Sequence, residues 1–183
     1  MTARDWTRRL ALRGGTGPGA TALPGRRYLV RARPAPVTVD CPIEDEEGEL
    51  AFSVDERAVR EGDALVLGDP FGRELHRVPG ERLYLGESVE IEGAGGGLAA
   101  LVRATRVRTV RGRWTATGPG WESLELRGSV PDDVYVMAAG ETRAAEISKR
   151  WFRLKNTNGV AMPPGEDGGL LIMIAVAADP MAC

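Results

Sequence analysis

The feature that most constrains the fold is an apolar run of nine residues, Leu170 to Ala178, which contains no polar or charged side chain. A helix that is apolar on every side must be surrounded by protein. The run is also far shorter than the roughly 18 residues that a membrane-spanning helix needs. Glu166 and Asp167 precede it and Pro180 follows it, and these residue types favour the start and the end of a helix. We therefore predict a buried C-terminal helix that does not cross a membrane.

The chain before this run favours strands. Short stretches of β-branched, aliphatic and aromatic residues alternate with Gly, Asp and Pro. Three of them repeat with a period of 24 residues, and the matching positions are Ile43, Leu67 and Ile91; Gly48, Gly72 and Gly96; and Val54, Val78 and Val102. Each copy has the pattern strand, turn, strand, which predicts three successive hairpins. A fourth, imperfect copy runs from Val136 to Ile147.

A hairpin meander leaves two unpaired edges unless it closes on itself, and closure into a barrel removes them. The inside of such a barrel is also the place where a chain of strands can enclose an apolar helix. We therefore predict one mainly β domain, a closed antiparallel barrel around the C-terminal helix, over residues 26–183. Residues 1–25 are predicted to be a flexible arm and linker, because residues 14–20 are rich in glycine.

Composition limits the possible functions. The formal net charge of -2 gives no general attraction to nucleic acid, and no such partner is expected. Two cysteines and one histidine are too few for a disulfide framework or a multi-histidine metal site, so a cytoplasmic protein without metal or cofactor is expected. No residue is assigned a catalytic role, and a binding protein is favoured over an enzyme.

The order of several motifs resembles the LURP-one-related family of the tubby C-terminal-like superfamily, which is distantly similar to phospholipid scramblases. The likeness covers roughly residues 26–181 and is carried by Tyr28-Leu29-Val30, Ile43-Glu44-Asp45 with Gly48, Leu67-Gly68-Asp69 with Gly72, the segment from Ala145 to Phe152, Gly159-Val160, and the apolar run ending at Ala178-Asp179. The resemblance implies about twelve strands around a central hydrophobic helix, and lipid headgroups as a class of ligand. The segment 154–161, which matches the calcium-binding segment of scramblases, lacks acidic ligands, so calcium binding is not expected.

Two basic groups are the candidate anion-binding or lipid-binding surface. They are Arg106, Arg108, Arg111 and Arg113 in a stretch that begins at Arg103, and Lys149 and Arg150 further on. Such a surface attracts anionic lipid at about 1 kcal/mol per charge. The first hypothesis is therefore a non-catalytic protein that docks on anionic lipid headgroups or on a protein partner, in the cytoplasm or peripherally at a membrane. A merely soluble basic surface, balanced by acidic turns, is the alternative interpretation.

A second hypothesis is a small-molecule-binding protein, or a biosynthetic cyclase or isomerase, that uses an external apolar groove. The candidate groove residues are His76, Tyr84, Trp114 and Trp121. For His76, a solvated position on a strand is favoured over the role of general base. A third hypothesis is a protein that acts through an oligomer interface, and the sequence leaves the oligomeric state open.

Overall fold

The computed structural model describes residues 25–31, 40–55, 64–80, 88–104, 113–129, 134–148, 157–163 and 167–178. These residues form twelve strands and one helix. The strands are β1 (Arg26–Arg31), β2 (Asp40–Glu44), β3 (Leu50–Asp55), β4 (Leu65–Gly68), β5 (Glu74–Val78), β6 (Ser88–Gly93), β7 (Leu98–Ala104), β8 (Arg113–Gly118), β9 (Trp121–Ser129), β10 (Val134–Ala139), β11 (Thr142–Ser148) and β12 (Thr157–Met162), and the helix is α2 (Gly168–Ala178). The predicted arm and linker lie almost entirely outside the described residues.

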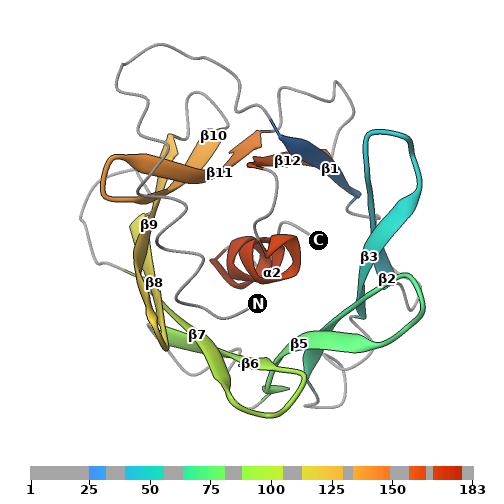
Figure 1. Cartoon of the computed structure of the whole chain (residues 1–183), viewed down its shortest axis with the longest axis horizontal. Coiled ribbons are helices and arrows are strands. Elements are labelled where there is room, and N and C mark those ends of the chain that lie inside the picture. Colours follow the sequence, from blue (N-terminus) through green and yellow to red (C-terminus); the bar gives the residue numbers. More distant parts are fainter. Residues whose placement is uncertain are drawn as a thin grey trace.

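The strands form one closed antiparallel barrel (Figure 1). Each strand pairs with the next one in sequence, and β1 closes the ring by pairing with both β2 and β12. The closing pair β1–β12 runs over six residues, from Arg26 opposite Met162 to Arg31 opposite Thr157. The predicted closed barrel of about twelve strands is confirmed.

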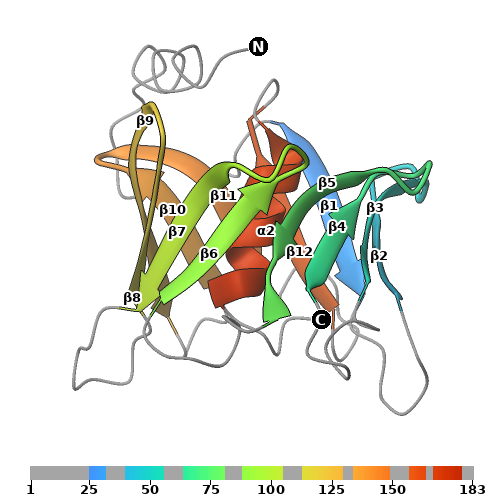
Figure 2. The same cartoon turned by 90° about the horizontal axis from the view of Figure 1, so that it is seen from below.

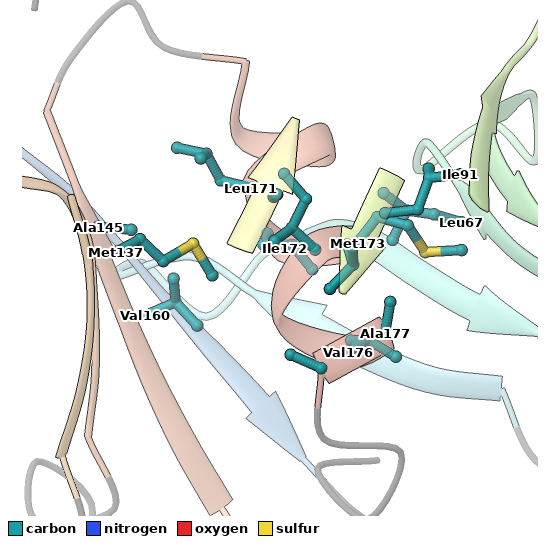
Figure 3. Packing of buried hydrophobic residues seen from close by; sticks show 14 of the residues in the cluster. Leu67, Ile91, Met137, Ala145, Val160, Leu171, Ile172, Met173, Val176 and Ala177 are labelled. Atoms are coloured by element: carbon teal, nitrogen blue, oxygen red, sulfur yellow. The ribbon is translucent and has the colours of Figure 1, made fainter. Parts of the chain in front are cut away.

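The helix α2 lies inside the ring of strands, as predicted (Figure 1). Leu171, Ile172, Met173 and Ile174 are completely buried. Figure 3 shows the side chains of α2 between two parts of the barrel wall, with Leu67 and Ile91 on one side and Met137 and Val160 on the other. Burying an aliphatic side chain of this size contributes about 1.5–3 kcal/mol, so the helix supplies the centre of the hydrophobic core.

The 24-residue repeat corresponds to three hairpins with the same turn. In the β2–β3 turn, the Asp45 N–H donates to the Glu49 carbonyl and the Gly48 N–H to the Asp45 carbonyl, and the β4–β5 and β6–β7 turns repeat both bonds. Gly48, Gly72 and Gly96 have φ angles of 83°, 79° and 77°, which glycine adopts without strain. The three predicted hairpins are confirmed.

The repeat continues further than the sequence analysis recognised. Gly120 in the β8–β9 turn lies 24 residues after Gly96 and has the same left-handed conformation, with φ 77°. Leu126 lies 24 residues after Val102 and is equally buried. The β10–β11 hairpin around Gly140 is the imperfect copy, with a different spacing. Five consecutive hairpins therefore build most of the barrel.

The five hairpin turns all lie at one end of the barrel, which we call the hairpin end (Figure 2). The helix α2 follows β12, which runs toward this end, so α2 also begins there. Asp167 caps its start, because the Leu170 N–H donates to Asp167 Oδ1 at 3.1 Å. Among the described residues, no helix has the length and apolar character needed to cross a bilayer.

Candidate functional site

Three arginines lie on the outer surface of neighbouring strands: Arg103 on β7, Arg113 on β8 and Arg127 on β9. Their alternate neighbours Val102, Leu126 and Gly128 are buried, so the strand pleat turns the arginines outward, and all three are exposed. We call these three residues the arginine face. It lies toward the end of the barrel opposite the hairpin end, because Arg103 is near the end of β7 and Arg113 begins β8.

Two members of the arginine face are direct cross-strand neighbours, since Arg113 stands opposite Arg127 in the β8–β9 register. Like charges in this position destabilise a sheet. Arg127 Nε donates to Glu125 Oε2 at 2.9 Å, and this contact, with a smaller effect of Arg113, lowers the pKa of Glu125. Within the part of the chain that the structure describes, Glu125 therefore offsets part of the charge of the two opposed guanidinium groups.

A carboxylate on β6 limits the extent of the arginine face. Glu90 stands opposite Leu101, which lies two residues before Arg103 on β7. The positive charge of the arginine face is therefore concentrated on β8 and β9, where Arg113 stands opposite Arg127.

The structure describes only part of the predicted basic surface. Arg113 is described, and it is exposed at the start of β8. Arg106, Arg108 and Arg111, and also Lys149 and Arg150, lie outside the described residues. Arg103 and Arg113, which lie in one basic stretch of the sequence, belong to two different strands.

Arg127 was missed by the sequence analysis. The available signal was the continuation of the 24-residue spacing to Gly120, which predicts a β8–β9 hairpin. Counting outward from that turn brings Arg127 close to Arg113, as the observed register shows.

His76 occupies an interior position, contrary to the solvated position that the sequence favoured. It lies on β5 with a residue exposure of 8%. It shares a face with Val78, which is completely buried. The parity of these two residues was the signal that places His76 inside the barrel.

His76 contacts the start of the helix. Its Nε2 lies 3.9 Å from Asp167 Oδ1, which is too long for a hydrogen bond but close enough for an electrostatic contact. The His76 imidazole lowers the pKa of Asp167, and the N–H groups of Leu170 and Gly169 lower it further, against the opposing effect of burial. Within the described residues His76 Nδ1 is enclosed and has no hydrogen-bond partner. A general base must reach its substrate, so this geometry suits a contact within the fold better than proton transfer.

The proposed groove residues do not share one location. Trp121 begins β9 at the hairpin end and covers Gly118, leaving no room for a Cβ there. Trp114 lies toward the opposite end of β8, where its ring centroid is 6.2 Å from that of Tyr135. Both tryptophans pack against the core, and His76 is three strands away from β8. Tyr84 lies outside the described residues.

Among the described residues, no group of three or more His, Cys, Asp or Glu side chains is arranged to hold an ion. The arginine face is therefore the best-supported candidate site that the described residues offer.

The fold and this site define a class of protein, a closed antiparallel β-barrel that encloses its own C-terminal helix and carries a basic patch on its outer wall. The model of the LURP-one-related family matches residues 27–179, and the chain belongs to that family. The crystal structure of a protein from Arabidopsis thaliana is similar, with a TM-score of 0.63 and 17% sequence identity over 88% of this chain and 94% of that chain. At this identity the likeness shows the fold alone. No curated protein shows significant sequence similarity.

Proposed function

We propose that this protein is a non-catalytic binding protein that docks on anionic lipid headgroups through the arginine face. The observation that carries the proposal is the direct opposition of Arg113 and Arg127 on β8 and β9. This arrangement costs stability in the free protein. An anionic ligand would remove that cost, because a phosphate group between two guanidinium groups accepts charge-assisted hydrogen bonds from both.

The surrounding sequence supports an extended basic surface. The segment 105–112, which joins β7 to β8, contains Arg106, Arg108 and Arg111. Clustered arginines near a membrane surface each add about 1 kcal/mol of attraction to anionic lipid. In this proposal the protein binds to the cytoplasmic surface of a membrane from the aqueous phase.

The interior supports binding at the outer wall instead of in the lumen. Barrels of suitable size hold small ligands inside, but here α2 occupies the lumen with completely buried side chains. A ligand-binding role must therefore use the outer surface, where the arginine face lies.

Vesicle co-sedimentation of the full chain tests the proposal. We expect the protein to pellet with vesicles that contain phosphatidylserine but not with pure phosphatidylcholine, and pelleting should weaken as salt is raised. Arg113→Glu should reduce binding about tenfold or more, because it reverses one charge in the contact. The matched control is Arg26→Glu, which changes an exposed arginine on β1, five strands away from β8.

The choice of Arg113→Glu separates binding from folding. The new carboxylate would stand opposite Arg127, so a repulsive cross-strand pair becomes an attractive one and stability should not fall. Thermal unfolding of the variant checks this. Negligible pelleting with both types of vesicle, or equal binding by Arg113→Glu and Arg26→Glu, contradicts the proposal.

A further inference from the structure

Phe71 is a large hydrophobic residue in an unusual environment. It lies in the β4–β5 turn at the hairpin end and is 87% exposed. The equivalent positions of the neighbouring turns carry Glu47 and Gly95, so the turn itself does not require an aromatic residue. An exposed phenylalanine forgoes about 1.5–3 kcal/mol of burial, which a docked partner could recover.

The turn that carries Phe71 is held rigidly. Asp69 Oδ1 accepts the N–H groups of Phe71 and Arg73, both at 2.9 Å. Asp69 Oδ2 accepts from Arg73 Nε at 2.7 Å, and Gly72 adopts a φ of 79°. The backbone beneath the ring is therefore fixed before any partner arrives. An aromatic side chain with few rotatable bonds on a fixed backbone loses little entropy on binding, which is the property of interface anchors.

The adjacent hairpin adds a second apolar side chain and negative charge. The β2–β3 turn is next to the β4–β5 turn, because β3 pairs with β4, and both point toward the hairpin end (Figure 2). Leu50 at the start of β3 is 43% exposed, and Glu47 and Glu49 beside it are exposed. Glu46 lies 3.8 Å from Arg27, so part of its negative charge is offset. The positive charge of Arg73 is likewise offset by Asp69.

We infer that the tips of the β2–β3 and β4–β5 hairpins form a docking surface for a basic, partly apolar protein segment. Aliphatic side chains of the partner would pack on Phe71 and Leu50, and its lysines or arginines would pair with Glu47 and Glu49. The acidic residues repel anionic membranes and nucleic acids, so charge complementarity selects a basic protein. This surface is separate from the arginine face, at the other end of the barrel.

Selection of random twelve-residue peptides displayed on phage, with the full chain as bait, tests the inference. We expect the enriched peptides to combine lysine or arginine with aliphatic residues. A synthetic peptide of the enriched sequence is then titrated by fluorescence anisotropy. Phe71→Ala should weaken its binding roughly tenfold, the loss expected for an anchor residue. Glu47→Lys combined with Glu49→Lys should weaken binding and remove most of its salt dependence.

The matched control is Leu98→Ala. Leu98 is 45% exposed and occupies the position equivalent to Leu50, but beside the uncharged glycine-rich turn of β6–β7. Its substitution should leave binding unchanged. Phe71→Ala is a surface change that should not affect folding by more than about 0.5 kcal/mol. Failure to enrich any peptide, enrichment of acidic peptides, or equal binding by Phe71→Ala and the unmodified chain overturns the inference. Vesicle binding through the arginine face should be unaffected by Phe71→Ala, so the two proposals succeed or fail separately.

Discussion

Asp69 and Asp167 each use one carboxylate oxygen to accept backbone N–H groups where the chain changes direction. Asp69 supports the β4–β5 turn and Asp167 caps α2. The backbone N–H of Arg73 is the main cause of the lowered pKa of Asp69, with further contributions from the Arg73 guanidinium and the Phe71 N–H. The sequence predicted both positions from residue type and spacing. It failed for His76, because an imidazole suits either face of a strand and only its parity with Val78 places it inside.

The cap at Asp167 predicts a pH-dependent effect of Asp167→Asn. Asparagine keeps a capping oxygen but lacks the charge that favours a helix N-terminus, so at pH 7 the variant should lose less than about 1 kcal/mol of unfolding free energy. The exposed fraction of the Asp167 side chain is 58%, and solvent screening keeps the loss small. Because the pKa of Asp167 is lowered in the folded state, its contribution is present above about pH 4 and lost as the pH falls through the lowered value.

Urea unfolding at pH 7 and at pH 2.5 measures this effect. The two proteins should differ at pH 7 and converge at the lower pH. Asp167→Ala is the comparison for the cap itself, since it removes both the charge and the oxygen and should cost about 0.5–2 kcal/mol. A difference between Asp167→Asn and the unmodified protein that grows as the pH falls would contradict the assignment.

At the scale of elements, α2 was predicted because a short apolar run without a polar face is stable only when protein encloses it. The orientation of α2 inside the barrel could not be predicted. The helix lies closest to β5, β6 and β7. A segment that is apolar on every side contains no pattern that indicates which strands each of its faces contacts. The hairpins could be predicted more completely, because each turn needs a glycine in the left-handed conformation and the position of that glycine fixes the strand register.

The helix should be sensitive to truncation at its enclosed positions. Ile172→Ala removes a completely buried side chain and should lower the unfolding free energy by about 2–5 kcal/mol. Leu170→Ala, in the same helix, changes a side chain that is only partly buried and should cost distinctly less. Chemical denaturation of both variants provides the comparison, and equal losses would argue against the enclosed position of Ile172.

At the scale of the whole molecule, the closed barrel followed from edge avoidance and the repeat. The arginine face did not, because it depends on the pairing of β8 with β9, and Arg127 lies outside the recognised basic stretch that contains Arg103 and Arg113. To predict a surface that is assembled from three neighbouring strands, the register of each pair of these strands must be known. Sequence spacing supplies this only where each turn is recognised.

Removal of α2 should abolish the cooperative fold. Its five largest buried side chains each contribute about 1.5–3 kcal/mol, together comparable with the total stability of roughly 5–15 kcal/mol of a typical domain. These side chains are Leu171, Ile172, Met173, Ile174 and Val176. A chain that ends at Glu166 should bind a hydrophobic dye and lose its near-ultraviolet circular dichroism. A sharp urea transition at the midpoint of the full chain would refute this expectation.

The position of α2 after β12 determines when the barrel can mature. During synthesis all twelve strands are made before α2, which their inner faces enclose in the folded protein. The ring cannot close until β12 is available to pair with β1. Contacts between such distant parts of a chain form slowly. Before β12 and α2 have been synthesised, the apolar inner face of the barrel has nothing to cover it and the edge of β1 is unpaired, and chains with such exposed surfaces and edges are prone to aggregate.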